Sequence, residues 1–309
     1  MTTVPVDAEI EPRAAAIPIP DIDADVLPTL RRTPLGPPPV LSDRVERHDH
    51  VVDDATGVVV RVHRPVGFDG PLPCLYSIHG GGYIMGSYVT DDPRFDRWCP
   101  EYGIVGVSVE YRLAPETPFP GPLEDCYAGL RWTVEHAAEI GVDPAKIGIT
   151  GVSAGGGLCA GLAILARDRG ELPVQFQLLE CPMLDDRQQT PSSQLEGLLI
   201  WSRVSNAFGW RSYLGDLYGT EAVPAHAAPA RCDDLSGLPE AYVCVGGADG
   251  FRDENILYAM RLYDAGVPTE LHVYPGLPHG VSMLAGTALA DRYRADADDW
   301  LRRQFERLG

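Results

Sequence analysis

Short apolar segments alternate with helical segments along most of this chain, and this alternation restricts its fold more than any other feature. Buried strands are predicted at residues 72–78, 104–110, 147–150, 174–179, 241–245 and 270–274. Helices are predicted at residues 93–102, 123–140, 154–168, 254–265 and 289–308. Continuous apolar strands separated by helices are typical of a parallel sheet that is covered on both faces. Two earlier runs, 44–53 and 58–64, read as antiparallel strands that extend the sheet to about eight strands.

Two segments do not follow this alternation. Residues 185–235 carry no strand signal and are too long for an ordinary loop. Residues 1–45 are rich in Pro, Ala and Asp and form no convincing strand. We therefore predict an α/β core made of residues 46–184 and 236–309, with a helical cap that combines residues 1–45 and 185–235.

Charge and cysteine content limit the partners of the chain. Its 25 basic and 44 acidic residues give a net charge of −19, so it repels phosphate backbones and anionic lipids. We expect binding to neither nucleic acid nor a membrane. The first residues lack the basic start and apolar core of a secretory signal. The seven cysteines show no CxxC spacing, which favours reduced structural thiols in a cytoplasmic protein over disulfides or a metal site.

The central chemical motif is Gly151-Val-Ser153-Ala-Gly155, which follows one predicted strand and precedes a predicted helix. A sharp strand-to-helix turn holds a serine in a strained conformation and projects its hydroxyl at the carboxyl edge of the sheet. The helix N-terminus behind it favours developing negative charge. Ser153 is therefore the predicted nucleophile.

A glycine run, His79-Gly-Gly81-Gly82-Tyr83, directly follows the strand at 72–78. Acyl transfer needs amide donors aimed at an oxyanion, and glycines let the backbone approach a carbonyl without a Cβ in the way. The amides of Gly81, Gly82 and Ala154 are the predicted oxyanion hole.

A serine nucleophile needs a base and an acid that orients the base. Among the eight histidines, only His279 lies on a loop just past the carboxyl end of a late strand. Asp249 ends the preceding strand segment, whereas Asp253, the weaker candidate, lies where a helix begins. The chain order Ser153, Asp249, His279 is that of α/β-hydrolases.

Five motifs together resemble the bacterial hormone-sensitive-lipase-like (family IV) esterases. They are HGGGY at 79–83, EYRLAPE at 110–116, GVSAGGG at 151–157, DGFRDE at 249–254 and PGLPHG at 275–280. The resemblance implies the α/β-hydrolase fold, a cap inserted after the sixth strand, and catalysis with no cofactor or metal. It assigns Ser153, Asp249 and His279 to the triad and implies that a homodimer is one assembly to expect.

Val152 and Gly250 depart from the family pattern, which commonly has Asp or Thr before the nucleophile and Pro after the acid. The resemblance therefore indicates the catalytic residues more firmly than it indicates the substrate preference. The substrate-pocket candidates are Tyr83, Val152, Trp201, Phe208 and Trp210; the aromatic residues of the cap segment fit a pocket wall and internal packing equally well.

These features predict a serine carboxylesterase that hydrolyses short- to medium-chain acyl esters through an acyl-enzyme. An amidase or arylformamidase using the same triad is the main alternative. A small-molecule receptor of this fold, as in the plant gibberellin receptors, would lack the catalytic base, and the presence of His279 argues against it.

Overall fold

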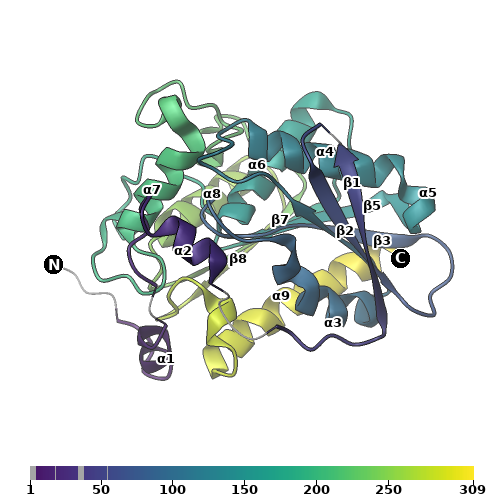
Figure 1. Ribbon diagram of the computed structural model, residues 1–309, viewed down its shortest axis with the longest axis horizontal. Helices are drawn as coiled ribbons and strands as arrows, with labels where there is room; N and C mark the ends of the chain where they lie inside the picture. Colours follow the sequence, from purple (N-terminus) through teal and green to yellow (C-terminus); the bar gives the residue numbers. More distant parts are fainter. Residues whose placement is uncertain (1–4, 18, 34–37, 54) are drawn as a thin grey trace.

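The computed structural model describes residues 5–17, 19–33, 38–53 and 55–309, and in this part of the chain an eight-stranded sheet lies between layers of helices (Figure 1). The strands are β1 (Val45–Asp53), β2 (Val58–Pro65), β3 (Leu72–Ile78), β4 (Val105–Glu110), β5 (Val142–Val152), β6 (Phe176–Glu180), β7 (Glu240–Gly246) and β8 (Thr269–Tyr274). The α-helices are α1 (Glu11–Ala15), α2 (Leu27–Arg32), α3 (Asp92–Tyr102), α4 (Gly121–Glu135), α5 (Ala137–Ile140), α6 (Ala154–Arg169), α7 (Arg203–Leu214), α8 (Arg252–Asp264) and α9 (Ala288–Leu308).

The strand order of the sheet is β1-β2-β4-β3-β5-β6-β7-β8. β1 and β2 are antiparallel to their neighbours, and the remaining pairs are parallel. The carboxyl ends of β3, β5, β7 and β8 therefore meet at one edge of the sheet, where ligands bind in α/β folds. The predicted α/β-hydrolase fold with a mostly parallel sheet is confirmed.

Both faces of the sheet are covered, because alternate residues of a strand enter two separate apolar clusters. In β3, Tyr76 packs into the cluster that contains residues of α4, α6 and α8. Its neighbour Leu75 packs into the cluster that contains Trp98 of α3 and Trp300 of α9. The helices predicted on both faces are confirmed by these clusters.

Two predicted elements differ from the structure. The helix predicted at 123–140 is divided into α4 and α5 at His136, whose ring Nδ1 lies 3.0 Å from the carbonyl oxygen of Trp132. β5 begins at Val142, earlier than the predicted 147, because Val142 pairs with Leu72 before an irregularity in the ladder. Pro144 in this early part of β5 hides the strand pattern in the sequence.

The two segments predicted to form a cap contact one another. Within residues 185–235, all of which are described, the regular elements are α7 and short 3₁₀ turns, without a strand. The backbone N–H of Ile22 donates to Ser205 Oγ on α7 at 3.0 Å, and α2 lies beside α7 (Figure 1). The more N-terminal α1 instead contacts the segment after β8, where Arg13 Nη1 donates to the Ala285 carbonyl at 3.0 Å. Asp7, which precedes α1, donates its N–H to the Gly276 carbonyl at 2.9 Å. Residues 1–4, 18 and 34–37 of the predicted cap segment lie outside the described residues.

In the described part of the chain, each helix falls short of the length and apolarity that a membrane crossing would require.

Candidate active site

Ser153 occupies the turn between β5 and α6, at the carboxyl edge of the sheet. Its φ of 58° and ψ of −122° are strained for a residue with a side chain. The glycines around it are required by close packing: a Cβ on Gly151 would overlap the carbonyl of Gly155, and one on Gly155 would overlap the carbonyl of Ile78. The turn is held by its own backbone, since Ser153 N–H donates to the Glu180 carbonyl at 2.8 Å.

Three side chains from separate parts of the chain are linked in one row of hydrogen bonds. Ser153 Oγ lies 2.9 Å from His279 Nε2, and His279 Nδ1 lies 2.7 Å from Asp249 Oδ2. The other oxygen of Asp249 accepts the backbone N–H of Phe251 at 2.9 Å, which fixes the carboxylate. The ring of Phe251 meets the His279 ring edge-on, with 5.0 Å between centroids. In this arrangement a base contacts a hydroxyl through one ring nitrogen and an acid through the other.

The loops that carry Asp249 and His279 are joined to each other. Ala248 N–H donates to the Leu277 carbonyl at 3.0 Å, and Gly247 N–H donates to the Tyr274 carbonyl at 2.7 Å. A Cβ on Gly246 would overlap the Leu277 carbonyl, so the two loops approach as closely as their backbones allow. Asp249 and His279 are thus positioned by one shared piece of backbone.

The pKa of His279 is raised well above its usual value of 6.5. Burial of the ring is the largest single effect and disfavours the charged form, but the adjacent Asp249 and Cys181 together stabilise that form more than burial disfavours it. A basic imidazole next to a hydroxyl is suited to accept the proton of Ser153.

The glycine run after β3 lies directly against the turn that holds Ser153. A Cβ on Gly80 would lie 2.8 Å from the Val152 carbonyl oxygen. Gly81 and Gly82 have φ values of 122° and 62°, which favour glycine. Within the described residues, no carbonyl or side chain accepts the amides of Gly81, Gly82 or Ala154. These amides are therefore available to a substrate oxygen.

His79 contacts the glycine loop at Gly80 and packs against Tyr111. Its Nδ1 lies 2.8 Å from the Gly80 carbonyl oxygen, and its ring stacks on Tyr111 at 4.2 Å. Burial lowers the pKa of His79 to about 4, so its ring is neutral. A neutral, stacked ring is suited to orienting the glycine loop.

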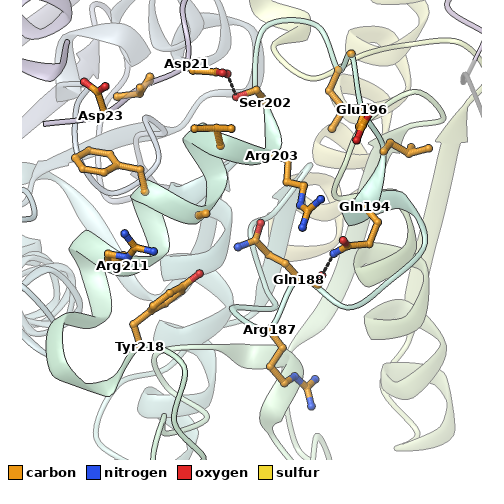
Figure 2. A pocket seen from close by; sticks show the side chains of 17 residues that line it. Asp21, Asp23, Arg187, Gln188, Gln194, Glu196, Ser202, Arg203, Arg211 and Tyr218 are labelled. Atoms are coloured by element: carbon orange, nitrogen blue, oxygen red, sulfur yellow. Dashed lines mark hydrogen bonds between the residues drawn. The ribbon is translucent and has the colours of Figure 1, made fainter. Parts of the chain in front are cut away.

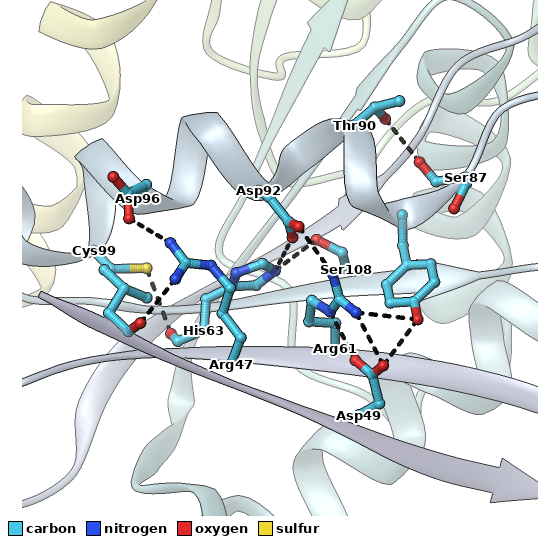
Figure 3. A network of polar contacts seen from close by, with 12 residues as sticks. Arg47, Asp49, Arg61, His63, Ser87, Thr90, Asp92, Asp96, Cys99 and Ser108 are labelled. Atoms are coloured by element: carbon cyan, nitrogen blue, oxygen red, sulfur yellow. Dashed lines mark hydrogen bonds and ion pairs between the residues drawn. The ribbon is translucent and has the colours of Figure 1, made fainter. Parts of the chain in front are cut away.

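A second serine, histidine and aspartate lie together elsewhere, in the polar network between β1, β2 and α3 (Figure 3). Ser108 Oγ lies 3.3 Å from His63 Nε2, and Asp92 Oδ1 lies 3.8 Å from the same nitrogen. Both partners share one ring nitrogen, so this histidine cannot pass a proton from one side of its ring to the other. Burial also lowers the pKa of His63 to about 3. This group is a structural network.

The pocket candidates are divided between three environments. Tyr83 and Trp210 are fully buried, and both pack against Tyr213 with centroid distances of 4.1 and 6.2 Å. Trp201 lies over the glycine loop, where its six-membered ring would overlap a Cβ on Gly82, and its ring lies 6.3 Å from that of His279. The side chain of Val152 is half-buried beside Ser153.

Phe208 is one of the residues that line a cavity of about 880 Å³ between residues 21–23 and the segment 185–235. Figure 2 shows this cavity. Arg203, Arg211 and Tyr218 lie on its wall, and Phe208 also borders a second cavity of about 720 Å³ beside α2. A row of hydrogen bonds connects the first cavity to the site: Gln188 Oε1 accepts from Asn206 Nδ2 at 3.1 Å, and Asn206 Oδ1 accepts from Trp201 Nε1 at 3.5 Å.

Three features of the site were not foreseen from the sequence. Phe251 packs on the base, Cys181 lies beside both Asp249 and His279, and Ile200 has a φ of 70°, which is strained for a β-branched residue. Proximity to Asp249 in sequence could have indicated Phe251. The other two carry no local sequence signal.

The chain is similar to known proteins over most of its length. A family model described as "alpha/beta hydrolase fold" matches residues 75–283. Esterase LipI of Mycobacterium tuberculosis is 39% identical over 71% of this chain and 68% of its own length. Carboxylesterase NlhH of the same organism is 38% identical over 79% of this chain and 77% of its own length.

A solved structure titled "Bacterial Heroin Esterase" superposes with a TM-score of 0.89 at 39% identity, covering 97% of this chain and 98% of that one. Because the family model spans more than half of the chain and these relatives match most of their own length, the assignment does not depend on the five motifs alone. The chain belongs to the α/β-hydrolase family, within its bacterial hormone-sensitive-lipase-like esterases.

Proposed function

We propose that this protein is a serine carboxylesterase in which Ser153 is the nucleophile, His279 the base and Asp249 the orienting acid. The observation that carries the proposal is the row of contacts at 2.9 and 2.7 Å that joins these three side chains. The esterase and carboxylesterase relatives support the reaction class.

In this mechanism Ser153 Oγ attacks the ester carbonyl carbon as His279 Nε2 takes the hydroxyl proton. The oxyanion receives hydrogen bonds from the amides of Gly81, Gly82 and Ala154. His279 then gives its proton to the leaving alcohol, and an acyl-enzyme remains. Water, activated by the same imidazole, hydrolyses the acyl-enzyme and restores Ser153. Asp249 stabilises the imidazolium in both steps.

The confined surroundings of Ser153 favour small acyl groups. Ser153 is 6% exposed and Trp201 is 7% exposed, with the Trp201 ring packed over the glycine loop. We infer that Trp201 limits the length of the acyl or alcohol group at this point, whereas the buried Tyr83 and Trp210 act by supporting the loop. Residues 1–45 and 185–235 would form the cap over the site.

A chain-length series of p-nitrophenyl esters tests this substrate preference. We expect kcat/KM to be highest for acyl chains of roughly four to eight carbons and to decline for longer chains. Trp201→Ala is expected to move the optimum to longer chains, while Trp132→Leu, remote on α4, leaves it in place. Matching p-nitroanilides, measured beside the esters, separate an esterase from an amidase. A rate that rises sharply when triolein forms droplets would contradict the preference.

The pH dependence of activity follows from the state of His279. The base must be neutral, so kcat/KM falls as the pH drops through the pKa of this ring. Because that pKa is raised above 6.5, we expect the acid decline to begin above pH 6.5, higher than for an unperturbed histidine. Rates measured in a chelating buffer from about pH 4 to pH 10 check this. Activity that stays constant down to the acid end of that range would point to a different base.

Location in the cytoplasm and homodimer formation stay predictions of the sequence.

A further inference from the structure

The thiol of Cys181 lies in the same buried group as the acid and the base of the site. Cys181, the residue after β6, has a φ of 39°, and its N–H donates to the Cys244 carbonyl at 2.7 Å. One ligand atom each from Cys181, Asp249 and His279 lies within 4.8 Å of the other two. The mechanism above uses the carboxylate and the imidazole but gives the thiol no role.

We propose that Cys181, Asp249 and His279 form an inhibitory binding site for a thiophilic divalent cation such as Zn²⁺. Thiolate, imidazole and carboxylate are the ligand types that Zn²⁺ prefers, and three protein ligands with a fourth position open form a common arrangement. The inhibitory effect rests on the proposed esterase function, whereas metal binding by these three residues does not.

The charges of the three ligands suit a buried ion. All three side chains are buried. Binding an ion there would cost free energy if its charge were not neutralised by the ligands. One thiolate and one carboxylate around a divalent cation and a neutral imidazole give a net charge of zero. On binding, the S–H bond of Cys181 breaks, a sulfur–metal bond forms, and the proton leaves to solvent.

The geometry requires only small movements. Metal–ligand distances of about 2.0–2.3 Å in a tetrahedron separate the ligand atoms by about 3.3–3.6 Å. The three atoms of this group are already within 4.8 Å of each other, and the hydrogen bond of 2.7 Å between Asp249 and His279 must widen.

Binding here must stop catalysis, because both ring nitrogens of His279 are already in use. A metal on Nδ1 replaces the contact with Asp249, and a metal on Nε2 replaces the contact with Ser153. In either case the imidazole no longer acts as the base.

The first measurement is zinc inhibition of p-nitrophenyl butyrate hydrolysis, with each variant normalised to its own rate without metal. Wild type and Cys232→Ser, a matched buried cysteine away from the triad, are expected to be inhibited alike and to recover with chelator. Cys181→Ser is expected to need about 100-fold more zinc, since loss of even an outer partner weakens a metal site about 10–100-fold. Mg²⁺, which prefers oxygen ligands, is expected to have no effect.

The second measurement does not depend on activity. Co²⁺ bound to a thiolate gives a near-ultraviolet charge-transfer band, which we expect in wild type, in Cys232→Ser and in the inactive Ser153→Ala protein, but not in Cys181→Ser. If Cys181→Ser fails to fold, Cys181→Ala serves the same purpose. Equal zinc inhibition in all variants, or the lack of the band in folded wild type, would overturn the site. A cobalt band in a wild-type protein that hydrolyses no ester would refute the esterase proposal alone.

Discussion

Ser153→Ala is expected to reduce kcat for p-nitrophenyl butyrate by at least about 10⁴-fold, because the acyl-enzyme cannot form without the hydroxyl. The remaining rate would come from the amides of the glycine loop, which still polarise the carbonyl. The turn does not depend on the hydroxyl for its conformation, because Ser153 is held through hydrogen bonds of its backbone N–H and carbonyl groups. We therefore expect the variant to unfold at nearly the same temperature as wild type.

Ser108→Ala is the matched control for this variant. Ser108 is also buried and also lies beside a histidine, 3.3 Å from His63 Nε2. Because that histidine shares one nitrogen between its partners, loss of the Ser108 hydroxyl should leave kcat within about threefold of wild type. Steady-state kinetics on the purified variants distinguish the two serines. Substantial hydrolysis by Ser153→Ala, or inactivity of a folded Ser108→Ala, would refute the assignment.

Asp249→Asn is expected to lower kcat by about 10³–10⁴-fold while the protein stays folded. The neutral amide cannot stabilise an imidazolium. An amide N–H directed at Nδ1 also makes that nitrogen an acceptor, so the ring proton moves to Nε2 and the acceptor facing Ser153 is lost. The loss should appear in kcat more than in KM, because Asp249 contacts the base and not the substrate.

Asp253→Asn tests the competing acid. Asp253 accepts the N–H of Ser192 and pairs with Arg252 at 2.7 Å, so its contacts are structural. We expect Asp253→Asn to alter the unfolding temperature more than the rate. If a folded Asp253→Asn loses activity while Asp249→Asn retains it, the acid has been assigned to the wrong residue.

Much of the fold was predictable because its signals are local. The apolar runs that became β3, β4 and β7 are buried on both faces over most of their length, and this burial produces a continuous apolar pattern in the sequence. The turn at Ser153 was predictable for a similar reason, since Gly151 is required by its contact with the Gly155 carbonyl only four residues away. Where the local signal was ambiguous, as at Pro144 and His136, the boundaries were wrong by several residues.

The sequence by itself determined the strand-and-helix order and marked the turn at Ser153 and the glycine loop, because these signals come from residues that are neighbours along the chain. Position after late strands predicted Asp249 and His279 as partners of Ser153, but only the tertiary structure brings the three side chains into contact. Among the described residues, two groups contain a serine, a histidine and an aspartate, and the packing of the loops after β7 and β8 gives His279 a different partner on each nitrogen. The same packing sets Trp201 over Gly82 and Cys181 beside the base. Such contacts follow from how the sheet brings strand ends together, and no short stretch of sequence encodes them.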